Sequence, residues 1–310
     1  MLAGIGMVYL QIIYNQSYKS IDTRNENNEN NSLADGMVLN VLIVGLDELE
    51  RRKGGRSDSN IIISLNARYR KMKIISLMRD IWVEIPGRNF DKLNAAYAIG
   101  GIQLAIDVVQ KNFGVKIDRY IVVDFKKFED AIDAIKGIDL NLTQKEVEYI
   151  NKYSKSSSRL KGSGKMHLNG NQALQFARNR DDPSADFKRT ERQRDVISAI
   201  IEKFKSMGIA ELLSSSKKVM GSMSTNFKIQ EIMGLIKVSK DFSDYKIEKY
   251  RVPNEYQLKM IDKKSVLTCD LKKEKEALKE FVYETKSFSK SGSDKLDKTS
   301  KNETEKNKDK

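Results

Sequence analysis

The sequence is poor in two residue types on which many active sites depend. It has one cysteine, Cys269, so an intramolecular disulfide is excluded. It has one histidine, His167, so a zinc site built from several histidines is excluded, and a Ser-His-Asp site would have to use that residue. His167 lies in the stretch GSGKMHLNG, which is typical of a surface loop. We therefore expect His167 to be a surface loop residue without a catalytic role.

A long hydrophobic run is also missing. The N-terminal stretch MLAGIGMVYLQIIY is apolar except for Gln11, but a membrane-spanning helix needs ~20 such residues, and no basic region precedes it as in a signal peptide. The polar, Asn-rich segment that follows cannot build a core for it to pack against. The stretch is either a short buried helix or the outer part of a membrane anchor whose start is missing. We favour a partial transmembrane signal-anchor at 1–16, followed by a linker at 17–37.

The charge balance indicates an anionic partner. The formal net charge is +13, and most of the excess lies outside the lysine- and serine-rich segment 287–310, which we expect to be disordered. Nucleic acid, an anionic membrane and a phosphate-bearing substrate all fit this charge. No helix-turn-helix, zinc or aromatic-basic binding motif is visible, so a nucleic-acid-binding regulator is disfavoured.

The hydrophobic pattern predicts one mixed α/β (α+β) domain over residues 38–286. Three short β-branched runs, Val38–Leu46, Asn60–Leu65 and Lys73–Met78, are joined by brief polar connections, which favours an antiparallel meander. We expect a mixed, largely antiparallel central sheet flanked by helices. The further strands are expected at Ile81–Ile85, Tyr120–Val123, Ile138–Leu142 and Tyr245–Val252, and the helices at Gly101–Phe113, Phe125–Ile135, Asn169–Arg178, Phe187–Met207, Ile209–Lys217, Gln230–Ser239 and Leu271–Thr285.

The stretch ARNRDDPSADFKRTERQRD, residues 177–195, holds five arginines and five acidic residues. The apolar stripe of the helix that follows, read toward its N-terminus, continues into Gln193, Arg189 and Asp186. These side chains therefore point inward. A buried arginine needs an anionic partner, because burying its charge alone costs several kcal/mol. Arg192 and Arg194 fall outside the stripe, and we expect them to be solvated.

The meander brings a second group of charges to one end of the sheet. Asp47 follows the first strand, Arg56 and Asp58 precede the second and lie two residues apart, and Arg79 follows the third. Two carboxylates at 4 Å repel by ~4 kcal/mol at an effective dielectric of 20 unless positive charge lies between them. Mg²⁺ fits, since it commonly binds one or two carboxylates and substrate phosphates. Two Asp–Arg salt bridges fit equally well.

Six blocks in uninterrupted order resemble the LytR-CpsA-Psr family. They are NVLIVGLD, RSDSNIIISLN, IISLMRD, IPGRNFDKLNAAYAIGG, LNGNQALQFARNR and DFKRTERQRD, between about Val38 and Ile201. The resemblance implies a membrane protein with a single span and its catalytic domain on the extracellular face, mostly in Gram-positive bacteria. Such proteins move anionic glycopolymers, such as teichoic acid or capsular polysaccharide, from an undecaprenyl pyrophosphate carrier to peptidoglycan.

The resemblance also implies roles for individual residues. Asp47 and Asp58 would hold Mg²⁺, and a hydrophobic channel between sheet and helices would take the lipid. The pyrophosphate would be surrounded by Arg56, Arg79, Arg178, Arg180, Arg189 and Gln193. The catalytic candidates are Arg56, Asp58, Arg79, Asp186 and Arg189.

Three points stay open at this stage. A lipid pyrophosphatase would use the same phosphate contacts with water as the acceptor, and the general base is not assigned, with Asp58 and Asp186 as candidates. Asn94 either supports the site or caps a helix. Trp82 and Tyr97 are expected in the core.

Overall fold

The computed structural model describes residues 38–46, 55–66, 69–155, 157–181, 185–221, 223–237 and 242–284. The predicted anchor, linker and C-terminal tail lie outside these residues. Within this described part, none of the helices combines the length and the apolar character needed to span a bilayer.

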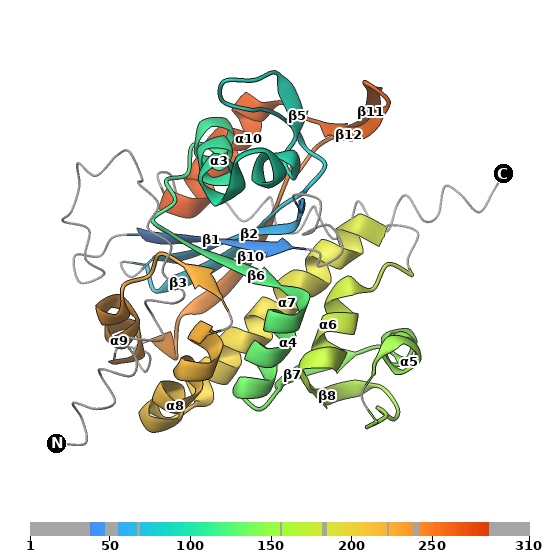
Figure 1. Cartoon of the computed structure of the whole chain (residues 1–310), viewed down its shortest axis with the longest axis vertical. Helices are drawn as coiled ribbons and strands as arrows, with labels where there is room; N and C mark the ends of the chain where they lie inside the picture. The colour runs from blue at the N-terminus through green and yellow to red at the C-terminus, as the bar shows by residue number, and fades with distance from the viewer. Residues whose placement is uncertain are drawn as a thin grey trace.

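A six-stranded sheet forms the centre of the molecule (Figure 1). The predicted meander is confirmed, since the first three strands pair antiparallel in sequence order. Two later strands join the meander in parallel, one on each side, and a short strand pairs antiparallel beyond one of them. The sheet is therefore mixed, as predicted. In spatial order its strands are β10 (Lys246–Val252), β3 (Lys71–Leu77), β2 (Ser57–Asn66), β1 (Val38–Leu46), β6 (Arg119–Asp124) and β9 (Ser224–Thr225).

Both faces of the sheet are covered, which explains why its strands are almost continuously apolar. Successive side chains point to opposite faces. In β2, Ile62 packs into the core on one face, while Ile61 and Ile63 pack into the core on the other. The same alternation places Ile75 of β3 on the first face and Ile74 on the second.

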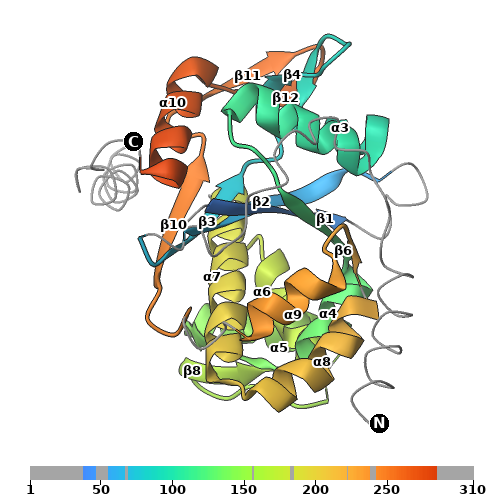
Figure 2. The ribbon, with the colours of Figure 1, turned by 90° about the vertical axis from the view of Figure 1, so that its left-hand side faces the viewer.

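The two faces carry different layers (Figure 2). On the first lie α3 (Ala95–Phe113) and α10 (Leu271–Tyr283), with the hairpins β4 (Trp82–Glu84) to β5 (Phe90–Lys92) and β11 (Gln257–Ile261) to β12 (Lys264–Thr268). The second carries the larger helical layer: α4 (Phe125–Ala134), α5 (Gln144–Tyr153), α6 (Gly170–Arg178), α7 (Ala185–Ser206), α8 (Ile209–Gly221) and α9 (Ile229–Lys237), with the hairpin β7 (Ile138–Leu142) to β8 (Gly164–Leu168).

The sequence pattern missed the short elements. The helix predicted from Gly101 begins at Ala95, and it is kinked at Gly100 and Gly101, where Gly101 has a positive φ of 64°. No prediction covered β5, α5, β8, β9, β11 or β12. His167 lies on β8 and not in a loop, although its side chain is exposed as expected and contacts Asp139 at 2.7 Å. The missed strands have two to five residues each, which is too short for a clear periodic signal.

Candidate functional site

The strand ends meet at one end of the sheet, as the meander predicted. Leu46, the last residue of β1, pairs with Ser57, the first of β2. The backbone of Asn94 links this strand to the segment after β3, because Ser57 N donates to Asn94 O at 3.4 Å and Asn94 N donates to Arg79 O at 3.0 Å. Asp58 and Arg79 are thereby held side by side. The chain continues from Leu46 into Asp47, which lies outside the described residues.

Four charged side chains form a continuous cluster there, which we call the arginine cluster: Asp58, Arg79, Asp186 and Arg189. Arg79 Nη1 lies 2.6 Å from Asp58 Oδ1, and Arg79 Nη2 lies 3.6 Å from Asp186 Oδ1. Arg189 Nη1 lies 3.2 Å from the same Asp186 oxygen. Since Asp186 and Arg189 lie in the first turn of α7, the sequence-predicted inward stripe of this helix meets the end of the sheet.

Arg189 is the most buried member, with 3% of its surface exposed. Its Nε and Nη1 atoms are buried without a hydrogen-bond partner, although Nη1 is near Asp186. Burial, and then the positive charge of Arg79, lower its pKa to about 10. A buried cation that keeps unused N–H groups is costly by itself, so this arrangement is suited to an incoming anion.

Arg79 lies in the opposite electrostatic environment. Burial opposes its charged form, but Asp58 and Asp186 outweigh burial and raise its pKa. Asp80 accepts from Arg79 Nε at 3.3 Å and from Lys92 Nζ at 2.7 Å. Sequence reasoning assigned no role to Asp80 or Lys92, because the hairpin that carries Lys92 was not predicted.

Gln193 lies one turn beyond Arg189 on the same side of α7. Ser59 Oγ of β2 donates to its Oε1 at 3.1 Å. Gln193 therefore faces the sheet beside the arginine cluster, as the helical stripe predicted, and it fixes α7 against the first residues of β2.

Of the three other predicted arginines, Arg180 lies near this cluster, whereas Arg56 and Arg178 have other neighbours. Arg56 is exposed directly before β2. Burial alone would raise the pKa of Asp91, but the hydrogen bond from Lys264 lowers it, and the charge of Arg56 contributes in the same direction. Arg180 is exposed and close enough to contribute to the lowered pKa of Arg189. The guanidinium of Arg178 instead lies over the Phe125 ring, 4.3 Å from its centroid.

The prediction that Arg192 and Arg194 are solvated was wrong. Arg192 donates to Glu146 Oε1 at 2.9 Å and to Asn179 O at 3.1 Å, with 11% of its side chain exposed. The Nε and Nη1 atoms of Arg194 are buried without a partner, and burial lowers its pKa to about 10. The reason is that α7 packs against the sheet on one side and against α6 and β7 on another, so more than one stripe is covered.

The open question at Asn94 is partly resolved. Asn94 precedes α3, but its side chain makes no cap hydrogen bond, and its buried Oδ1 has no partner. The side-chain cap is therefore wrong, and the backbone of Asn94 joins β2 to the segment after β3. Trp82 and Tyr97 are both half-buried, and Tyr97 packs against the core of the first face.

The metal prediction depends on one described carboxylate. Asp58 keeps its side chain 24% exposed, and its contact with Arg79 uses Oδ1. Among the described residues, no three His, Cys, Asp or Glu side chains gather closely enough to hold a metal ion by themselves. Of the two predicted Mg²⁺ ligands, Asp58 is therefore the described one, and Mg²⁺ commonly takes only one or two protein carboxylates.

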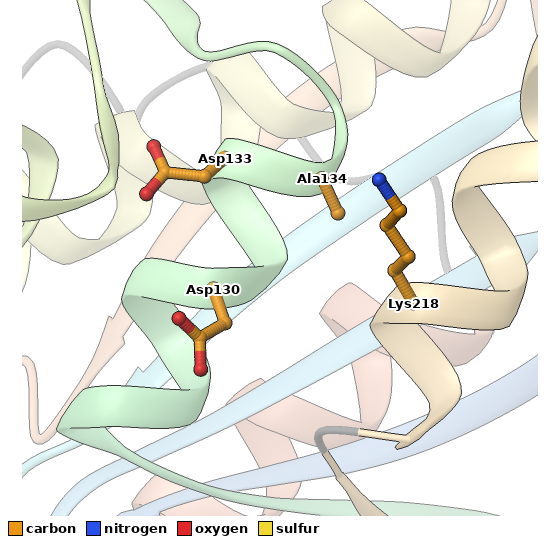
Figure 3. Close-up of a pocket in the computed structure, with 4 residues that line it drawn as sticks. All are labelled: Asp130, Asp133, Ala134 and Lys218. Atoms are coloured by element: carbon orange, nitrogen blue, oxygen red, sulfur yellow. The ribbon is translucent and has the colours of Figure 1, made fainter.

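A pocket of about 250 Å³ elsewhere has a different character. It is lined by Asp130, Asp133 and Ala134 of α4 and by Lys218 of α8. Figure 3 shows both carboxylates pointing away from the Lys218 ammonium. Asp130 pairs with Lys126 at 2.6 Å, and Asp133 accepts from Gly170 N at 2.7 Å. Asp130 thus forms an exposed ion pair within α4, and Asp133 joins α4 to α6, so we assign this pocket no chemistry.

The chain matches known proteins over most of its length. The profile described as the LytR_cpsA_psr family matches residues 7–286. The polyisoprenyl-teichoic acid–peptidoglycan teichoic acid transferase TagU of Bacillus cereus is 35% identical over 209 residues, covering 64% of this chain and 66% of TagU. The corresponding transferase TagV of Bacillus subtilis is 31% identical over 241 residues, covering 75% of this chain and 61% of TagV. The chain thus spans slightly less than two thirds of these relatives.

A solved structure gives the same fold. TagT (YwtF) with bound octaprenyl pyrophosphate lipid superposes with a TM-score of 0.65 at 23% identity, covering 86% of this chain and 100% of the TagT chain. This agreement confirms the mixed sheet with flanking helices that the sequence predicted.

Proposed function

This chain belongs to the LytR-CpsA-Psr family, and on that premise we propose that it transfers an anionic glycopolymer of the teichoic acid type from a polyprenyl pyrophosphate carrier to peptidoglycan. One observation carries the proposal: Arg189 is buried beside Arg79 with N–H groups that have no hydrogen-bond partner. Guanidinium groups bind phosphate oxygens in pairs, so two converging arginines suit a pyrophosphate.

The reaction follows from this arrangement. An acceptor hydroxyl attacks the phosphorus that carries the sugar, a new P–O bond forms, and the bond from that phosphorus to the bridging oxygen breaks. The lipid leaves as a monophosphate, and the hydroxyl proton passes to a base. Arg79 and Arg189 neutralise the charge that grows on the leaving phosphate, so catalysis is mostly positioning and charge stabilisation. Asp58 and Asp186 contact these arginines and are the candidate bases.

A magnesium ion is part of the proposal. Asp58, together with Asp47, would hold it, and when bound it would supply further positive charge to the phosphate oxygens. We expect EDTA to reduce transfer by at least about tenfold, since a metal Lewis acid stabilises the charge of the transition state by several kcal/mol. Added Mg²⁺ should restore the rate, and Asp58→Asn should weaken Mg²⁺ binding measured by calorimetry. Unchanged transfer in EDTA, with an unchanged melting temperature, would rule out the metal.

The lipid would lie between the sheet and the helices of the second face. Apolar side chains there are only partly buried, although they belong to the core that joins the sheet to α7 and α9: Leu39, Ile43, Ile63, Ile197, Leu235, Phe242 and Ile247. These side chains extend from the opposite end of the sheet, where Leu39 and Ile247 lie, to Ile197, two turns beyond Arg189 on α7. Such a partly covered apolar strip is suited to a polyprenyl chain. With residues 1–16 as the anchor, the domain would work on the outer face of the cell membrane.

The activity can be tested with the full-length protein and a polyprenyl pyrophosphate-linked glycopolymer. We expect polymer to appear on added peptidoglycan and polyprenyl monophosphate to be released only when that acceptor is present. Release at the same rate without acceptor would identify the hydrolase alternative instead. Salt-sensitive DNA binding at nanomolar protein, without transfer, would identify the regulator.

Arg79→Ala is expected to reduce transfer by about 10²- to 10³-fold, because one charged donor to the transition state is lost. Arg70→Ala is the matched control, since Arg70 also pairs with an aspartate, Asp244, but lies at the opposite end of β3 and is largely exposed. Equal transfer by both variants would contradict the role of Arg79.

A further inference from the structure

A pocket of about 390 Å³ opens at the base of the β11–β12 hairpin. This hairpin lies on the first face of the sheet (Figure 2). None of the sequence motifs reaches this part of the chain. The pocket is lined by residues before and within β11, at the end of β12 and before α10: Glu255, Tyr256, Gln257, Lys259, Thr268, Cys269 and Asp270.

The pocket adjoins the arginine cluster. The Tyr256 ring stacks on the Phe187 ring, with centroids 4.9 Å apart and planes 28° apart. Phe187 directly follows Asp186, which contacts both arginines of the cluster. The guanidinium of Arg251 lies over the Phe187 ring, 4.5 Å from its centroid. A ligand in the pocket would therefore lie one aromatic pair away from Asp186.

A second contact joins the β11–β12 hairpin to β5. Lys264 Nζ of β12 contacts Asp91 Oδ1 at 2.7 Å, and the charge of Arg56 acts on the same carboxylate. The two connections, through Phe187 and through Asp91, fix the position of the pocket relative to Arg56 and Asp186.

The lining is nearly balanced in charge, unlike the arginine-rich cluster. Glu255 pairs with Lys273 at 2.7 Å. Asp270 caps α10 by accepting from two backbone N–H groups. Burial raises the pKa of Cys269 to about 12, so its thiol carries no charge at neutral pH. With Lys259 beside these groups, the pocket is not a second site for a polyanion.

The polar groups of the lining fit a sugar. Amide, carboxylate and hydroxyl groups can exchange hydrogen bonds with sugar hydroxyls. Tyr256 keeps 38% of its surface exposed. The negative face of an aromatic ring attracts the slightly positive C–H groups of a pyranose. One aromatic ring in a mostly polar lining suits a sugar better than an apolar ligand.

We propose that this pocket binds neutral sugar residues of the acceptor glycan and thereby places the attacking hydroxyl beside Asp186. This inference rests on the proposed transfer function. In this scheme the arginine cluster binds the charged donor, and the hairpin pocket binds the uncharged acceptor. Tyr256 is a binding residue in this scheme and takes no part in the bond changes.

The test uses the full-length protein with Tyr256→Ala and chitotetraose, a neutral oligomer of N-acetylglucosamine, as the probe. We expect calorimetry or NMR titration to show binding to the unaltered protein and about five- to tenfold weaker binding to the variant, the loss that a ring contact of this kind accounts for. In the transfer assay, the KM for the glycan acceptor should rise by a similar factor. Binding of octaprenyl pyrophosphate should not change.

Two further variants keep the result interpretable. Tyr256→Phe keeps the ring and should retain most of the probe binding. Tyr153→Ala removes a tyrosine that is 45% exposed on α5, and it should behave as the unaltered protein. Loss of octaprenyl pyrophosphate binding in Tyr256→Ala, or no change in probe binding and acceptor KM, would overturn the inference. Probe binding through Tyr256 in a protein without transfer activity would keep the sugar site and reject the proposed function.

Discussion

Replacing Arg189 by methionine is expected to abolish polymer transfer without lowering the stability of the fold. The side chain is 3% exposed and its Nε has no hydrogen-bond partner, so the charge is held in place at a cost. Methionine fills a similar space without unused N–H groups, and Asp186, which is 36% exposed and still near Arg79, is not left as a buried unpaired charge. The lost phosphate contact should cost about 10²- to 10³-fold or more in the transfer rate. Transfer assays and thermal melting of the same preparation measure both effects.

Arg192→Met is the matched control, three residues further along α7. Arg192 is also covered, but it is fully engaged by Glu146 and Asn179. Its removal leaves Glu146 without its ion-pair partner, so we expect about 3 kcal/mol of lost stability. The transfer rate per folded molecule should stay near that of the unaltered protein. If Arg189→Met lost stability and kept activity, the assignment of the phosphate site would be wrong.

The same pair gives a pH signature. Burial alone would raise the pKa of Glu146, but hydrogen bonds from Thr143 and Arg192 outweigh it and lower the pKa. A carboxylate with a lowered folded pKa contributes stability above its unfolded pKa of about 4.3, and that contribution is lost as the pH falls through the folded value. The stability difference between the unaltered protein and Arg192→Met should therefore be full at neutral pH and shrink in acid.

Replacing Lys73 by methionine is expected to produce the largest loss of stability, about 3–5 kcal/mol. Lys73 is fully buried in β3, and its ammonium bonds to the carbonyls of Phe281 and Val282 at the end of α10 and to Glu284. Burial lowers the pKa of Lys73, but these partners surround the charge. Without it, the last carbonyls of α10 and the Glu284 carboxylate are left unpaired. Urea unfolding measures the effect.

Lys71→Met is the control for that experiment. Lys71 contacts the same Glu284 at 3.0 Å from the same strand, but 25% of its side chain is exposed. Exposed ion pairs contribute about 0–1 kcal/mol, so the loss should be small. Similar losses in the two variants would show that burial of Lys73 does not matter.

The large elements could be predicted because burial on both faces leaves a clear pattern. In β1 the predicted and observed bounds agree, and the stripe of α7 correctly placed Asp186, Arg189 and Gln193 against the sheet. The same reasoning failed for Arg194, because a helical stripe describes one contact face and α7 has more than one. It also failed for β11 and β12, which have five residues each. The apolar side chains of β11, Leu258 and Met260, are exposed and so mark no buried face.

The individual side-chain contacts of the site could not be predicted from the sequence. The pattern predicted that Asp58 and Arg79 would meet, but it left a metal and a salt bridge equally open, and the structure has a 2.6 Å contact between them. The choice depends on side-chain geometry that no spacing encodes. The position of Lys92 beside Asp80 depends on a three-residue hairpin strand, which is too short to give a periodic signal.

The order of the strands also bears on how the domain stays dispersed. The outermost strands of an open sheet present unpaired backbone groups that can recruit another chain, and nature blocks this with short or charged outer strands. Here β9 has two residues, and β10 carries Lys246, Glu248 and Lys249, the last of them paired with Asp195 at 2.7 Å. We therefore expect this domain to resist edge-to-edge strand pairing with other copies, even at high local concentration.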